Sequence, residues 1–510
     1  MSKRPFLATG FLAVALGGSA ILPGSGSDGI LCRKLEPPIQ VGLRAVAGSP
    51  AGELRVAIEV RTEAVLTDMR MVVRLEDRAQ ATSRQETRAL TVPFGETLRD
   101  ELALRGAPES GTLFVGVEGR RGNAVFHRTA ALEIGPPLAR GLAGVTRADS
   151  EGRTYFEVRS ASPAEAARGG VAAALSGKAS YEDRPYTRTG FTGKRVKLPI
   201  RYATVQLVAD DDGSVLATSS TDARGNYTLT TGADGSRRVH VAVAASSRSP
   251  YAAQIVNSTR GIYALAGRSF SAGAPPSAQD FTAAQADLGG VFNMLDASIR
   301  GSDLVLALSP GARLPLLRIF WEKDGEDGTY FNGAGIHVLG IRSDPDEYDE
   351  DVLLHEFGHY VASSFSWDTS PGGDHNPYDD RPEPPDLAWS EGFAHWVSSE
   401  ARGAPSYVDN SATGHSFFEL EGPTPRDVTR GEGNEIAVGA ILWDISDAAN
   451  EPHDRMDRKR AKLWEVTNGY FRERQPDATL DAFCEGWIAR GLGETSALAA
   501  IFRDRSASCP

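Results

Sequence analysis

The stretch Asp351-Val-Leu-Leu-His-Glu-Phe-Gly-His-Tyr360 places two histidines four residues apart with a glutamate between them. On an α-helix this spacing puts His355 and His359 on the same face. Two neutral imidazoles so placed can bind one tetrahedral zinc ion, and the adjacent carboxylate of Glu356 can take a proton from water on that metal. The other residues are mostly apolar, as in a buried helix that exposes one polar stripe to a cleft. The stretch therefore predicts a hydrolytic zinc site rather than two histidines on an ordinary helix.

A catalytic zinc site needs a third protein ligand, and the segment Ala388-Trp-Ser-Glu-Gly-Phe-Ala-His-Trp396 offers Glu391. The segment is apolar and compatible with a helix, and a carboxylate buried among aromatic residues needs a partner such as a metal ion. Gly392 and Ala394 would let this second helix approach the first one closely. His375, in a glycine-containing loop, is the competing third ligand.

The motif His355-Glu356-Phe-Gly-His359, followed by Glu391 in a Ser-Glu-Gly-Phe-Ala context, resembles the gluzincins, the thermolysin-like clan of zinc metallopeptidases. The resemblance extends over residues 280–510. It implies an α+β zincin-type metallopeptidase domain with a helical C-terminal lobe. It also implies that His355, His359 and Glu391 bind zinc and that Glu356 is the general base.

The chain departs from the family pattern in two places. His395 stands where the family often has an aspartate that orients a zinc-bound imidazole, so His395 or another carboxylate must take that role, or the site is weakened. The interval between His359 and Glu391 is longer than in thermolysin, which indicates an inserted loop. The resemblance further implies a donor for the developing oxyanion on the C-terminal lobe, for which His415 and Tyr407 are the candidates.

Composition describes an ordinary globular chain. Its 510 residues are 41% hydrophobic and 24% charged, enough for about three domains. The net charge of −13, with no long basic segment, argues against nucleic acid as the main partner and against an anionic lipid surface. The expected partner is a peptide or protein substrate.

The N-terminus predicts export. Residues 1–22 begin with Lys3 and Arg4 and continue as a short apolar run interrupted by glycines, which is typical of a removed signal peptide. An uncleaved anchor is one alternative, and lipid attachment through Cys32 is another, although the bulky Leu31 precedes it. The mature chain is expected to have no transmembrane span. It is expected to be secreted, periplasmic or at the cell surface, and association with the cell surface or cell wall is left open.

Three cysteines are present, and an exported protein can form disulfides. Cys484 and Cys509 are the expected pair, which would tie the C-terminal tail to the last domain. None of the three cysteines has a histidine close in sequence, so none is expected to be a nucleophile.

Two β modules are expected before the zinc motif. Residues 36–137 contain short runs of alternating hydrophobicity separated by turn residues, which predicts a β-sandwich. Residues 138–190 are rich in Ala, Gly, Ser and Arg and are predicted to be a linker. Residues 191–248 resemble the carboxypeptidase regulatory-like domain, a small transthyretin-like β-sandwich, most specifically in the turn from Asp222 to Tyr227. Such a domain implies scaffolding, or carbohydrate and surface contacts.

In the C-terminal region the pattern predicts a helix over 284–295 and strands over 317–321 and 335–340. By the family resemblance, 333–341 would form the edge of the cleft and pair with substrate backbone. The acidic segment 344–351 is predicted to cap the zinc helix. Further helices are expected over 434–444, 461–470 and 480–489, with Asn434 and Glu435 either lining the cleft or capping a helix.

The leading hypothesis is thus an exported zinc metallopeptidase. An endopeptidase is favoured because Phe331-Asn-Gly-Ala-Gly-Ile336 lacks the Gly-x-Met-x-Asn string of gluzincin aminopeptidases. One alternative is a catalytically inactive zinc-binding surface or adhesion-type protein, against which the retention of Glu356 argues. Another is a hydrolase acting on non-peptide amides in cell-wall or glycan material.

Overall fold

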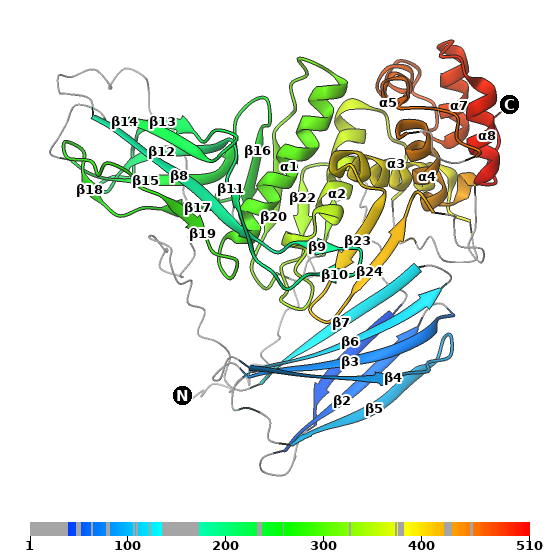
Figure 1. The fold of residues 1–510 in the computed structure, drawn as a ribbon, viewed down its shortest axis with the longest axis horizontal. Helices are drawn as coiled ribbons and strands as arrows, with labels where there is room; N and C mark the ends of the chain where they lie inside the picture. Colours follow the sequence, from blue (N-terminus) through cyan, green and yellow to red (C-terminus); the bar gives the residue numbers. More distant parts are fainter. Residues whose placement is uncertain are drawn as a thin grey trace, which may run out of the picture.

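The computed structural model describes residues 39–46, 53–62, 65–77, 82–105, 108, 111–121, 124–134, 173–231, 237–258, 260–325, 328–372, 375, 382–422, 431–448 and 452–509. It shows a multidomain protein with β-sheets in the N-terminal half and most helices in the C-terminal half (Figure 1). The expected signal peptide 1–22 and Cys32 lie outside these residues. Within the described chain, no helix has the length and apolar character needed to cross a membrane.

The N-terminal module consists of antiparallel strands in two sheets, one of order β1-β2-β5 and one that contains β7-β6-β3-β4. Buried side chains alternate along β2, where Val56, Ile58 and Val60 point into a core that also contains Leu113 and Val115 of β6. The strands are β1 (Ile39–Ala45), β2 (Glu53–Thr62), β3 (Thr67–Asp77), β4 (Thr82–Ala89), β5 (Thr97–Arg105), β6 (Gly111–Arg121) and β7 (Ala124–Ile134).

A second β module follows, with sheets of order β11-β8-β14 and β13-β12-β15. Its strands are β8 (Ala173–Asp183), β9 (Tyr186–Thr187), β10 (Gly190–Phe191), β11 (Val196–Pro199), β12 (Ala203–Ala209), β13 (Val215–Ser220), β14 (Asn226–Thr231) and β15 (Arg238–Ser247). The predicted linker 138–190 is therefore wrong from residue 173 onward, while 138–172 lies outside the described residues. The strand was not predicted because its sequence lacks a clear alternation of apolar and polar residues. Leu175, Ala179 and Tyr181 of β8 are buried, but alanine, serine and glycine residues lie between them.

This second module shares a sheet with the C-terminal region. From β15 the sheet continues through β16 (Ala253–Val256), β20 (Leu317–Trp321) and β22 (Ile336–Val338) to β21 (Tyr330–Phe331). Strand β20 has the predicted bounds. Strand β22 lies between β20 and β21, so it is not the free edge strand that the expected pairing of 333–341 with substrate backbone requires. Among the described residues, β21 is the outermost strand of this sheet. Short strands complete the region: β17 (Ala264–Ala266), β18 (Phe270–Ser271) and β19 (Phe281–Ala283).

Helix α1 (Gly289–Leu308) packs on this sheet and begins later than the predicted residue 284. The carbonyl of Ala284 accepts hydrogen bonds from the backbone N–H groups of Asp287 and Gly289, so the chain forms a turn before the helix. Gly289 is required there, because a Cβ on it would lie 2.6 Å from the Tyr348 hydroxyl.

The C-terminal half is a helical layer built on α2 (Glu350–Phe365), α3 (Pro385–Arg402) and α4 (Glu435–Ser446). The remaining elements are η2 (Asp346–Tyr348), η3 (Gly431–Gly433), α5 (Arg460–Trp464), η4 (Glu465–Tyr470), α6 (Phe471–Arg474), α7 (Leu480–Ala489) and α8 (Thr495–Asp504). A disulfide joins Cys484 of α7 to Cys509, with Cα atoms 5.7 Å apart, as predicted from the sequence.

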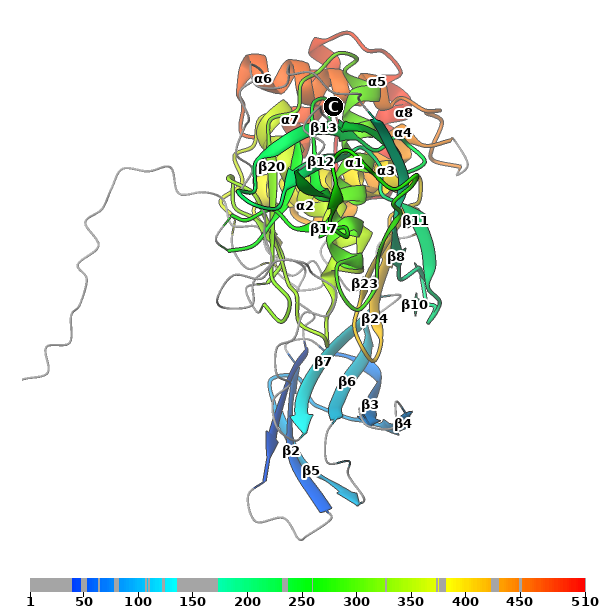
Figure 2. The ribbon, with the colours of Figure 1, turned by 90° about the vertical axis from the view of Figure 1, so that its left-hand side faces the viewer.

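A hairpin connects the helical layer to the N-terminal module. Strands β23 (Ser406–Asn410) and β24 (His415–Glu419) extend the N-terminal sheet, with Phe417 opposite Val125 of β7. Figure 2 shows the N-terminal strands continuing from this hairpin, away from the helices. Tyr407 and Phe418 of the hairpin share one hydrophobic core with the sandwich, so the zinc-motif helices and the first module are packed together.

Candidate metal centre

Helices α2 and α3 lie in close contact where the motif requires it. A Cβ on Gly358 would lie 2.6 Å from Cα of Ala394, so the absence of a side chain allows the two backbones to approach. Ala394 has the predicted role, whereas Gly392 faces a different helix. A Cβ on Gly392 would lie 2.6 Å from Cβ of Val438 on α4. Glycine thus brings α3 close to both α2 and α4.

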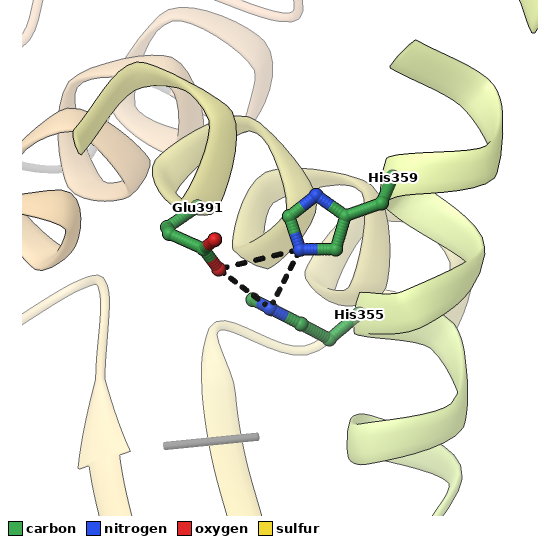
Figure 3. A group of neighbouring side chains, drawn as sticks. All are labelled: His355, His359 and Glu391. Carbon is green, nitrogen blue, oxygen red and sulfur yellow. Dashed lines mark hydrogen bonds and ion pairs between the residues drawn. The ribbon is translucent and has the colours of Figure 1, made fainter. Parts of the chain in front are cut away.

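The close approach brings His355, His359 and Glu391 together (Figure 3). Oε2 of Glu391 lies 3.1 Å from Nε2 of His355 and 3.3 Å from Nε2 of His359, and the two Nε2 atoms are 3.2 Å apart. All three side chains are almost completely buried. The structure therefore joins the two histidines to Glu391, the residue expected as the third ligand.

These donors fit a zinc ion. Donors of a tetrahedral ion with bonds of about 2.0–2.1 Å are separated by about 3.3 Å, close to the three distances found here. Oε1 of Glu391 and both carboxylate oxygens of Glu356 are buried without a hydrogen-bond partner among the described residues. Buried carboxylates without partners are unfavourable unless a cation offsets them. The donor set, two imidazoles and a carboxylate, is that of a catalytic zinc site with one open position.

His355 is oriented by a second histidine. Nδ1 of His355 lies 3.0 Å from Nδ1 of His395, and Nε2 of His395 lies 3.6 Å from Oε1 of Glu435. His395 thus occupies the position where the family often has an aspartate, and Glu435 on α4 supplies the carboxylate behind it. This arrangement leaves Nε2 of His355 facing Glu391.

His359 has its own orienting groups. Nδ1 of His359 lies 3.4 Å from Oγ of Ser390, and that hydroxyl donates to Oδ2 of Asp368 at 2.9 Å. A metal-ligating histidine ordinarily donates its other ring N–H to such a partner, which fixes the ring and its tautomer. Neither Ser390 nor Asp368 was predicted from the sequence, although Ser390 directly precedes Glu391.

Burial and neighbouring charges shift the pKa values in the site. Burial and the nearby His395 lower the pKa of His355 to about 3. Burial also opposes charge on His359, but the Glu391 carboxylate outweighs it and raises the pKa of His359 to about 9. The imidazoles of His359 and His375 hold the pKa of Glu391 well below its usual range despite burial. Burial raises the pKa of Glu356 to about 7, in the range suited to a general base.

The two expected oxyanion donors lie in different places. The Tyr407 ring is buried beside the imidazoles, with its centroid 5.1 Å from that of His395 and 6.0 Å from that of His355. His415 instead lies close to Gly190 and has Glu118 as a charged neighbour, on the side of the N-terminal sheet. Among contacts between described residues, none joins His415 to the donor triad. Its oxyanion role, like that of Tyr407, stays a prediction.

The acidic segment before α2 does not cap the helix as predicted. Neither Asp349 nor Pro345 makes a side-chain cap at η2 or α2. Instead Asp349 accepts a hydrogen bond from the backbone N–H of Asn410, and Asp351 accepts one from Val408. These carboxylates attach β23 to the start of α2, which places Tyr407 beside the histidines. By contrast, Asn434 does cap a helix, as one of its two expected roles: its side chain accepts a hydrogen bond from the backbone N–H of Ala437 at the start of α4.

Comparison with protein families adds one match. Residues 314–487 match the Mycolysin C-terminal domain. The matched range contains His355, Glu356, His359 and Glu391 and excludes both β modules, and it places this part of the chain in a metallopeptidase context. A search of curated proteins finds no match to this chain.

Three solved structures resemble parts of this chain, but the similarity is too low to support a conclusion about its fold or function. A structural-genomics target is 12% identical, covers 22% of this chain and 95% of its own, and has a TM-score of 0.15. Red sea bream transglutaminase is 12% identical over 40% of this chain and 28% of its own, with a TM-score of 0.15. A cross-linked adhesin from Mobiluncus mulieris is 9% identical over 40% of this chain and 80% of its own, with a TM-score of 0.11.

Proposed function

We propose that this chain is an exported zinc metallopeptidase of the thermolysin-like clan, with an α+β zincin-type domain. The observation that carries the proposal is the buried triad of His355, His359 and Glu391, with donor atoms 3.1–3.3 Å apart beside Glu356. The family match over 314–487 supports a peptidase. The disulfide between Cys484 and Cys509 supports an oxidising, exported location.

Each residue of the site has a role in this proposal. His355, His359 and Glu391 would hold the metal, with His395 and Ser390 fixing the two rings. Zinc bound there supplies a Lewis acid that polarises a carbonyl and lowers the pKa of water. Glu356 takes the proton of the attacking water and later delivers it to the leaving amine. Its burial favours this role, because a raised pKa allows the carboxyl group both to accept and to release a proton near neutral pH.

Strand β21 is the proposed binding edge for an extended peptide. It is the outermost strand of this sheet among the described residues, and an extended peptide can add to a strand in that position. The ring of Phe331 lies 6.4 Å from that of Tyr360, one turn after Glu356 on α2. Substrate backbone paired to β21 would thus lie beside the face of α2 that carries the general base. Main-chain pairing tolerates many side chains, so it implies little side-chain specificity. The preference for an endopeptidase rests on the missing Gly-x-Met-x-Asn string.

The test is digestion of a denatured peptide library by the full chain, with products identified by mass spectrometry. We expect cleavage at internal positions, and a rate about 10²–10⁴-fold lower for Glu356→Gln. Glu485→Gln, on an exposed face of α7, is the matched control and should cut at the original rate. Zinc content is measured in parallel. If the original chain carries zinc and yet cuts nothing, the alternative of an inactive zinc-binding surface protein replaces the peptidase proposal.

A further inference from the structure

A second group of donor atoms adjoins the zinc triad. Nε2 of His375 lies 3.3 Å from Oε2 of Glu435 and 3.6 Å from Oε2 of Glu391. The ligand atoms of these three residues all lie within 4.8 Å of one another. From the sequence, His375 was the competing candidate for the third zinc ligand, and Glu435 was expected to line the cleft or cap a helix. The structure places His375 beside Oε2 of Glu391, the same oxygen that faces His355 and His359, and places Glu435 beside His375.

The carboxylates of this group are buried and poorly satisfied. Glu435 is fully buried, and neither of its side-chain oxygens accepts a hydrogen bond from a described residue. Glu383, also buried, accepts the backbone N–H of Glu435 through Oε2 at 2.8 Å, while its Oε1 has no such partner in the described chain. Together with Glu391, three carboxyl groups thus converge at a site whose nearby cationic groups are imidazoles. Such convergence is unfavourable without a further positive charge.

The packing holds Glu435 in place. It is the first residue of α4, after the capping residue Asn434. A Cβ on Gly392 would lie 2.8 Å from the carbonyl oxygen of Glu435, so α3 and α4 make backbone contact at this level. Glu391 and Glu435 therefore project from rigid, closely packed helices, and only His375 comes from a loop.

We propose that His375, Glu391 and Glu435 bind a second divalent cation, with Glu391 bridging it to the triad. Separations of 3.3 and 3.6 Å are those of donors around one ion with bonds of about 2.0–2.2 Å. One imidazole and two carboxylates suit zinc or manganese. The inference rests on the proposed function, because both ions share Glu391. A second ion there would add to the single metal ion of the proposed function and make a two-metal centre, in which paired ions typically lie about 3.5–4 Å apart.

The test is metal stoichiometry. The full chain is stripped with a chelator, titrated with Zn²⁺, passed through a desalting column and analysed for bound metal by mass spectrometry. We expect about two ions per chain for the original protein and about one for His375→Gln and for Glu435→Gln. Glu432→Gln, an exposed carboxylate three residues before Glu435, is the matched control and should retain two. Circular dichroism checks that each variant is folded. If Glu435→Gln does not fold, the stoichiometry of the loop variant His375→Gln still tests the second site.

The outcomes separate the two proposals. If the original chain binds one ion that is lost in His359→Gln and kept in His375→Gln, the second site is overturned and the zinc triad is supported. Protonation of the buried carboxyl groups would then explain how they lie close together without a second ion. Two ions kept in both His375→Gln and Glu435→Gln would overturn the ligand assignment. No bound ion in the original chain would overturn the second site and the proposed function together. Spin coupling in the Co²⁺-loaded chain, absent from His375→Gln, would support the shared Glu391 bridge.

Discussion

Nδ1 of His395 lies 3.0 Å from Nδ1 of His355, so one imidazole orients the other. If His355 is to bind metal through Nε2, its Nδ1 must carry the proton and donate it to His395. Nε2 of His395 then carries a proton toward Glu435, 3.6 Å away. His395, which departs from the family pattern, therefore contacts His355 on one side and faces a carboxylate from another helix on the other, at a separation longer than a hydrogen bond.

Replacing His395 should weaken metal binding without abolishing it. Loss of a group that orients a metal ligand typically lowers metal affinity about 10–100-fold, and we expect this range for His395→Ala. The measurement is zinc affinity by competition with a chelator. His240→Ala, the same exchange in the second β module, should leave the affinity unchanged. An unaltered affinity in His395→Ala would show that the contact with His355 is only packing.

Zinc binding should release a proton near neutral pH. In the metal-free chain the Glu391 carboxylate raises the pKa of His359 to about 9, so this imidazole is protonated at pH 7. A metal ligand must be unprotonated, so binding displaces that proton. Calorimetric titrations at pH 7 in buffers of different ionisation enthalpy should report release of about one proton or more. The release from His359 should decrease as the pH rises toward 9, and a pH-independent zero would contradict the assignment.

The donor triad could be predicted from sequence, but the groups behind it could not. The four-residue spacing of His355 and His359 predicts that they share one face of a helix. The apolar residues around Glu391 predict that its carboxylate is buried and needs a partner. Asp368, Glu383 and the role of Glu435 depend on which elements pack around α3, which local patterns do not record.

The fold was predictable to a similar extent. Strand β20 follows from its run of apolar residues, whereas β8 is concealed among small residues that show no clear alternation. The position of β22 inside the sheet depends on the two-residue strand β21, which is too short to have a pattern of its own.

Adding a methyl group to Gly358 should destabilise the protein. Alanine is favoured over glycine by about 1 kcal/mol in a helix, but the new Cβ would lie 2.6 Å from Cα of Ala394. Overpacking of this kind typically costs about 1–3 kcal/mol, so we expect a net loss of stability and weaker zinc binding in Gly358→Ala. Gly422→Ala is the control, because its Cβ would meet no atom closer than 3.9 Å. Equal denaturation midpoints for the two variants would show that α2 and α3 separate readily.

The disulfide between Cys484 and Cys509 should stabilise the last two helices. It closes a loop with a sequence separation of 25, and constraining a loop of that size in the unfolded chain is worth about 3–4 kcal/mol. We therefore expect the double exchange of Cys484→Ala and Cys509→Ala to increase hydrogen exchange in α7 and α8 and to lower the denaturant midpoint of this region. Adding reductant should bring the original chain down to the same midpoint and leave the double variant unchanged. Reduction is confirmed by detecting free thiols. If the denaturant midpoint of the original chain does not change after reduction, the disulfide does not stabilise these helices. Packing of Trp487, Leu498 and Phe502 would then hold them in place.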